Sequence, residues 1–216
     1  ARVYEIALGQ ASAFPGGVGL RRGARIDLPD QSVVLPVQPT GSYQWWGGAV
    51  DQANARMTQK QAVAIPPAGA ALTFRTAYDL EAGWDFLWVQ VSADNGASWD
   101  TLTNEHTTAS HDPAWIGALY GFPDDLAAAG IGGFSGVSTG WPNYQVERFS
   151  LDPYAGQPVK LRFWYMTDWG TLGNGPYLDS VAIASGATTL FSASADGGDA
   201  PWTYEAPWER NVGVRY

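Results

Sequence analysis

Apolar and polar residues alternate with a period of two along several segments of this chain, and helical periodicity is almost absent. The clearest of these segments are residues 32–37, 71–78, 85–92, 158–166 and 177–184. Such alternation is typical of strands that bury one face, and the 26 Gly and 14 Pro of the chain provide turn formers between them. Asn95-Gly96, a strong hairpin signal, predicts that the third segment pairs with residues 98–102. We therefore expect an all-β protein.

Residues 103–141 hold no convincing strand. A loop of this length in a compact domain is usually functional or mobile. We favour a long crossover between the two sheets of a sandwich. The alternative is a binding surface formed by the aromatic residues of this loop, which are Trp115, Tyr120, Phe122, Phe134 and Trp141.

Length, charge and cysteine content narrow the functional classes. With 216 residues, the chain can form one large β domain or two small ones. Its 12 Lys and Arg against 21 Asp and Glu argue against nucleic acid or an anionic membrane as partner, because both need clustered cations. The absence of Cys excludes disulfides and thiolate metal sites. The start lacks a secretory signal and an initiator Met, which suggests a fragment, and no segment resembles a membrane span.

Two carboxylates each precede the apolar residues on one face of a predicted strand. Asp85 shares its face with Leu87, Val89 and Val91, and Asp179 shares its face with Val181 and Ile183. A buried charge is costly unless it is paired, so each position requires a counter-charge. The nearest basic residues in the sequence are Arg75, Lys160 and Arg162, of which the last two are expected to point to solvent.

A bound Ca²⁺ is the other way to balance these acids, because it takes six to eight oxygen ligands in irregular geometry. Asp79 and Glu81 precede Asp85 and would add oxygens, and Gly83 would provide the bend. We predict that Asp79, Glu81, Asp85 and Asp179 surround one cation at the rim of the core. The alternative is that Asp79 and Glu81 are solvated loop acids and that Asp85 accepts backbone hydrogen bonds.

Catalytic motifs do not appear in the sequence. The histidines, His106 and His111, are five residues apart, whereas a zinc peptidase helix requires His-Glu-x-x-His. A nucleophile elbow, a phosphate-binding loop and a dinucleotide fingerprint are also lacking. We expect no enzymatic activity from this chain by itself.

Several motifs together resemble a known family. They are an acid-containing turn with Trp-Asp that leads into a strand ending in Ser-x-Asp-x-Gly-x-x-Trp (residues 81–99), a Tyr-Ala-Gly turn before an Arg-Phe strand (154–163), and Tyr-Leu-Asp (177–179). From Leu28 to Phe191 the chain is similar to the β-sandwich domain that follows the catalytic domain in immune inhibitor A-type secreted metallopeptidases.

This resemblance implies a MAM-like or galactose-binding-like jelly roll, and calcium is associated with relatives of that fold. It carries over Glu81, Asp85 and Asp179 as the acids of the motif, together with Asp79. It also implies that the zinc-binding catalytic domain lies upstream in the same polypeptide, outside this chain, and that the protein is secreted. The expected layout is a lead-in at 1–27, a jelly roll with one long loop insertion at 28–191, and a link to a further module at 192–216.

The expected function is that of a non-catalytic accessory domain. It would bind a structural Ca²⁺ and either stabilise the protease or dock its protein or polysaccharide substrate. The alternative is a carbohydrate-binding module that uses exposed aromatic residues. Trp115, Tyr120 and Trp141 are the candidate ligand-binding residues, although aromatic residues of a sandwich more often pack in its core.

Overall fold

The computed structural model describes residues 3–7, 23–27 and 32–215, which fall into two compact units. In the smaller unit, β1 (Val3–Ala7) pairs antiparallel with β2 (Gly23–Asp27), and β3 (Val33–Val34) pairs antiparallel with β16 (Val214–Arg215). Most of the predicted lead-in, residues 1–27, lies outside the described residues. The larger unit, Leu35–Gly213, contains the sandwich.

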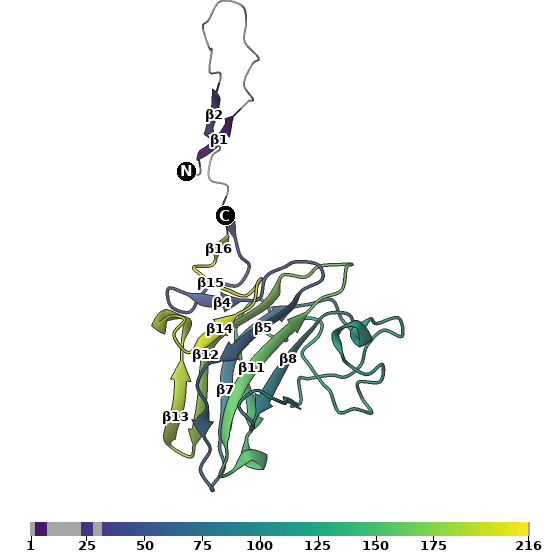
Figure 1. The fold of residues 1–216 in the computed structure, drawn as a ribbon, viewed down its shortest axis with the longest axis vertical. Helices are drawn as coiled ribbons and strands as arrows, with labels where there is room; N and C mark the ends of the chain where they lie inside the picture. The colour runs from purple at the N-terminus through teal and green to yellow at the C-terminus, as the bar shows by residue number, and fades with distance from the viewer. Residues whose placement is uncertain (1–2, 8–22, 28–31, 216) are drawn as a thin grey trace, which may run out of the picture. The chain divides into compact units, whose positions relative to one another are not determined.

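Two antiparallel sheets form the sandwich (Figure 1). The first sheet has the order β10 (Gln145–Ser150), β7 (Ala71–Asp79), β12 (Gly175–Ser185), β4 (Gln44–Trp46), β15 (Glu209–Asn211), and β13 (Thr188–Ala193) also pairs with β12. The second has the order β14 (Trp202–Tyr204), β5 (Asn54–Gln59), β11 (Pro158–Met166), β8 (Phe86–Ser92), β9 (Asp100–Leu102), and β6 (Val63–Ala64) pairs with β11. Short 3₁₀ turns lie at η1 (Gly117–Tyr120), η2 (Asp152–Tyr154) and η3 (Ala195–Gly197).

The strand pairing is that of a jelly roll. β4 pairs with β12 and β7 with β10 in the first sheet, while β5 pairs with β11 and β8 with β9 in the second. Early strands therefore pair with late ones in nested order, as expected when a long hairpin folds over into two sheets. The predicted all-β jelly roll is confirmed, and the hairpin around Asn95-Gly96 connects β8 to β9 as the dipeptide indicated.

The main core lies between the sheets, where Leu87, Val89 and Val91 of β8 are buried as predicted from the alternation. β8 is nevertheless buried along its whole length. Phe86 and Trp88, which occupy its other face, belong to a second apolar cluster that is also fully enclosed. Some other part of the chain must therefore cover the outer face of this sheet.

Residues 103–141, called the insertion below, provide that cover. Trp115, Phe122 and Leu126 pack on Phe86 and Trp88 from outside the sheet, and the rings of Trp88 and Phe122 are stacked at 4.3 Å. The insertion connects β9 of one sheet to β10 of the other, so it is a crossover as expected, and it also carries a second small core. Figure 1 shows it as the loops beside β8.

The chain beyond residue 191 continues the sandwich. β13 crosses the boundary at 191, β14 pairs with β5, and β15 pairs with β4. Within the described part, these pairings place residues up to Asn211 in the two sheets. A link to a further module beyond that point stays a prediction. No helix in the described part of the chain has the length and apolar character needed to cross a membrane.

Candidate cation site

A tight turn between β7 and β8 brings two of the predicted acids together. The backbone N–H groups of Trp84 and Asp85 donate to the carbonyl of Glu81, at 3.2 and 2.9 Å. Gly83 has φ of +79°, a left-handed conformation that favours glycine. The turn therefore places the half-buried Glu81 beside Asp85, whose side chain is only 1% exposed.

The third acid of the site comes from the loop after β11. β11 pairs antiparallel with β8, and Met166 lies opposite Phe86, so residues just past Met166 lie next to residues just before Phe86. The N–H of Asp168 donates to Oδ1 of Asp85 at 3.2 Å, and Asp168 is 6% exposed. One carboxylate oxygen from each of Glu81, Asp85 and Asp168 lies within 4.8 Å of the others.

The electrostatics of this cluster disfavour three negative charges. Burial raises the pKa of Asp85 from 3.8 to about 7; backbone hydrogen bonds from Asp168 and Glu81 lower it, and the charges of their carboxylates raise it further. Among the described residues, Arg56 forms an ion pair with Glu205 and His106 contacts Glu147, and neither contact involves the cluster. The cluster has the composition of an oxygen-ligand cation site.

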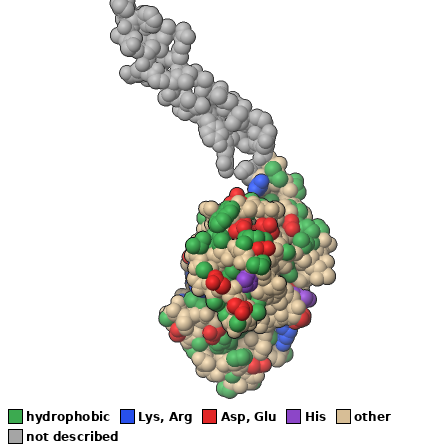
Figure 2. Space-filling model, turned by 90° about the vertical axis from the view of Figure 1, so that its right-hand side faces the viewer, with side chains coloured by type: hydrophobic (Ala, Val, Ile, Leu, Met, Phe, Trp, Pro, Cys, Tyr) green, Lys and Arg blue, Asp and Glu red, His purple; other side chains and the backbone are tan. Residues whose placement is uncertain are grey.

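The insertion supports the turn that carries these acids. The hydroxyl of Ser135 accepts from the N–H of Gly83 at 2.8 Å and donates to the carbonyl of Glu81 at 3.3 Å. The N–H of Asp112 donates to the carbonyl of Gly83 at 3.1 Å. Figure 2 views this side of the molecule, where acidic side chains are spread over the face and Lys and Arg lie at its margins.

The structure does not place Asp79 in the cluster. Its carboxylate accepts hydrogen bonds from the backbone N–H of Asn174 at 3.2 Å and from Nδ2 of the same residue at 2.6 Å. Asp79 is the last residue of β7 and lies opposite Gly175. It thus holds the start of β12 to the end of β7.

Asp179 also lies outside the cluster. Its Oδ1 accepts from the N–H groups of Ser180 and Ala195 at 2.7 and 3.0 Å, and its Oδ2 accepts from Thr40 at 3.1 Å. In the register of the sheet it faces Arg75, well inside β7, whereas Asp85 follows the end of β7. Of the four predicted acids, the structure brings Glu81 and Asp85 together. Asp168 joins them, and Asp79 and Asp179 have separate hydrogen-bonding roles.

The predicted ligand-binding aromatic residues are engaged within the fold. Trp115 is 6% exposed and donates from Nε1 to the carbonyl of Trp84 at 3.1 Å. Tyr120 is half-buried and donates to the carbonyl of Thr167 at 3.2 Å, and Trp141 packs on Tyr177 with ring centroids 6.0 Å apart. Trp115 is therefore buried, whereas Tyr120 and Trp141 keep part of their surface exposed.

The side chains of the two histidines make their contacts outside the acid cluster. Nδ1 of His106 lies 3.0 Å from the buried carboxylate of Glu147, and Nδ1 of His111 lies 2.9 Å from the carbonyl of Asp112. Neither is part of the group of three possible ligands found among the described residues.

Residues 22–207 match the family described as immune inhibitor A-like, MAM domain. The chain belongs to this family. The resemblance inferred from the motifs is thereby confirmed, and the match runs past the predicted boundary at 191 into β14, in agreement with the pairing of that strand.

The chain is similar to part of two longer proteins, one of which is a metalloprotease by name. It is 26% identical over 175 residues to the pre-pro-metalloprotease PrtV of Vibrio cholerae serotype O1, strain M66-2. It is 24% identical over 173 residues to immune inhibitor A of Bacillus thuringiensis subsp. alesti. Both alignments cover 80% of this chain but only 16% of PrtV and 22% of immune inhibitor A, so the chain spans a small part of the length of these relatives.

Proposed function

We propose that this chain is a non-catalytic accessory domain of a secreted metalloprotease and that it binds a structural Ca²⁺ through Glu81, Asp85 and Asp168. The observation that carries the proposal is the convergence of these carboxylates within 4.8 Å, two of them almost fully buried, with no cationic side chain in an ion pair with them in the described part of the chain. Membership of the family supports the accessory role.

The chemistry of the donors favours calcium over other cations. All three ligands are carboxylates, which are hard oxygen donors, and neither His nor Cys is among them. Zinc would be expected to recruit nitrogen or sulfur ligands. Ca²⁺ requires more than three oxygens, so backbone carbonyls or water would complete its shell. We expect no zinc in this domain, since a catalytic zinc would belong to the upstream domain.

The cation would act as a cross-link. Glu81 and Asp85 belong to the β7–β8 turn and Asp168 to the loop after β11, so one ion would hold two loops at the same end of the sandwich. The contacts of Ser135 and Asp112 with this turn would extend the effect to the insertion. Such a domain would stabilise the upstream catalytic domain, or it would present a rigid surface that binds a protein or polysaccharide substrate outside the cell.

Thermal unfolding of the chain with Ca²⁺ and with a chelator tests the site. The proposal predicts that chelation lowers the melting temperature and that Asp168→Asn abolishes this response. An unchanged melting temperature in chelator would overturn the calcium site. For the accessory role, the parent polypeptide should lose its peptidase activity faster on warming when this segment is deleted, and equal inactivation rates would contradict stabilisation.

A further inference from the structure

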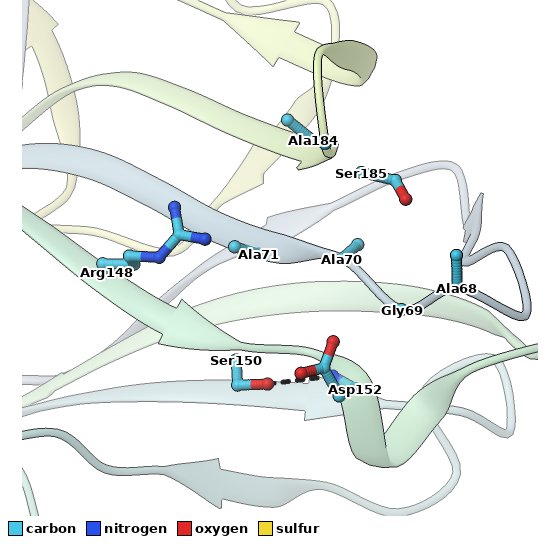
Figure 3. A pocket seen from close by; sticks show the side chains of 10 residues that line it. Ala68, Gly69, Ala70, Ala71, Arg148, Ser150, Asp152, Ala184 and Ser185 are labelled. Atoms are coloured by element: carbon cyan, nitrogen blue, oxygen red, sulfur yellow. Dashed lines mark hydrogen bonds between the residues drawn. The ribbon is translucent and has the colours of Figure 1, made fainter.

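A pocket of about 310 Å³ opens on the first sheet at the start of β7, whereas the acid cluster lies beyond the end of that strand. It lies where β10 ends, β7 begins and β12 ends. Figure 3 shows Arg148 and Ser150 on β10, Ala71 on β7, Ala184 on β12, and Asp152 just beyond the end of β10. The pocket shares no residue with the acid cluster.

Small residues create the hollow. Ala71 lies opposite Ser150 on one side and opposite Ala184 on the other, so three neighbouring strands present only small side chains at this level of the outer face. Ala is depleted in strands because it adds little packing. Its repetition here leaves space between the longer side chains that border the pocket.

Two opposite charges border the pocket without partners. The side chains of Arg148 and Asp152 are both exposed, and neither forms an ion pair or a side-chain hydrogen bond within the described part of the chain. In Figure 3 the guanidinium of Arg148 extends toward Ala71. Gly69 allows the approach of Asp152, because a Cβ at this position would collide with its carboxylate.

The hydroxyl groups of serine complete the polar lining. Ser150 accepts a hydrogen bond from the N–H of Asp152 at 3.1 Å, which leaves its own O–H free to bond a ligand. Ser185 lines the opposite side. The pocket thus combines a strong donor, a strong acceptor and hydroxyls above an alanine floor.

We propose that this pocket binds a neutral sugar residue. A sugar hydroxyl can donate to the Asp152 carboxylate while another accepts from the Arg148 guanidinium, and the C–H face of the ring can lie on the alanines. Because the two charges are opposite, the pocket offers neither an anion nor a cation a net attraction, and an apolar ligand would cover both charges without replacing their hydration. The volume is at the lower end of the range for small-molecule sites, which suits a single ring and weak affinity.

Chemical-shift mapping by NMR on the full chain tests this site. Glucose, galactose, mannose and N-acetylglucosamine would be titrated one at a time to tens of millimolar. We expect at least one sugar to shift the amide signals of residues 68–71, 150–152 and 184–186. Arg148→Gln and Asp152→Asn should each weaken that binding at least fivefold.

Arg75→Gln is the matched control. Arg75 is exposed on β7, outside the pocket lining, so its loss should leave the affinity unchanged. Glycylglycine serves as a zwitterionic probe of the same charge pair. The proposal is overturned if none of the sugars shifts these signals, if the shifts map elsewhere, or if glycylglycine binds and the sugars do not. Calcium and its chelator should not alter the sugar response, which separates this site from the cation site.

Discussion

Replacing Asp85 by Asn should stabilise the protein in the absence of calcium and abolish its stabilisation by calcium. Without the ion, ionised Asp85 is a buried charge beside two other carboxylates, and an amide removes that charge at nearly constant shape. With the ion, the same change removes a ligand. Wild type should therefore gain stability from Ca²⁺, while Asp85→Asn should be more stable than wild type in chelator and insensitive to the ion.

The magnitude follows from the pKa of Asp85. Every tenfold change in an equilibrium constant corresponds to about 1.4 kcal/mol, so holding this group ionised in a site that raises its pKa from 3.8 to about 7 costs about 4 kcal/mol. Asn keeps only one of the two backbone hydrogen bonds that Asp85 accepts from Asp168 and Glu81, a loss of about 1 kcal/mol. The net gain in chelator at pH 8 is about 3 kcal/mol, or roughly 6–12 °C in melting temperature.

Calcium removes most of this difference. At a free Ca²⁺ concentration a hundred times its Kd, wild type gains about 2.7 kcal/mol in the free energy of unfolding, and Asp85→Asn gains none. The assay is denaturant unfolding at pH 8 with EGTA or with Ca²⁺. Asp124→Asn, an exposed acid of the insertion, is the matched control and should behave as wild type. A less stable Asp85→Asn in EGTA, or a preserved response to Ca²⁺, would refute the reasoning.

Three further outcomes follow. Asp179→Asn should lower the free energy of unfolding by about 1–3 kcal/mol because donors lose their acceptor, equally in EGTA and Ca²⁺; a lost calcium response would restore Asp179 to the cation site. Trp115→Ala should cost about 3–5 kcal/mol and expose the insertion to proteases, while Leu119→Ser, on a side chain 74% exposed, should change neither. In EGTA the stability of wild type relative to Asp85→Asn should be greatest below pH 4 and fall as pH rises through about 7. The reason is that the Asp85 carboxyl binds its proton more tightly in the folded state than in the unfolded state. Denaturant titrations at several pH values measure this difference, and a flat difference would contradict the prediction.

Strand patterns and motifs in the sequence were sufficient for the fold and the family. The alternation in β8 and β11 and the turn at Asn95-Gly96 are patterns of residues that are neighbours in the sequence. They can be recognised without knowing which strand pairs with which. The pairing of Glu81 with Asp85 was also accessible, because a turn with Gly83 between them brings residues four apart into contact.

The sequence also indicated that the outer face of the second sheet is buried, although the alternation of apolar residues alone did not show it. Phe86 and Trp88 make the outer face of β8 apolar, so the strand reads as a nearly continuous apolar run, a pattern typical of strands buried on both faces. A strand that is apolar on both faces needs a packing partner on each, and Trp115 of the insertion is part of the partner on the outer face. The sequence did not show which segment would supply it.

The composition of the candidate site was decided by strand register. Asp168 is 83 residues from Asp85 in sequence, and only the pairing of Met166 with Phe86 brings it there. Asp179 resembles Asp85 in its position on a strand, but its register opposite Arg75 gives it different neighbours. The sequence by itself determined the strands, the jelly roll through family likeness, and the local pair of acids. Tertiary structure decided which distant acid completes the cluster and where the alanine-lined pocket opens, because both depend on contacts between strands remote in sequence.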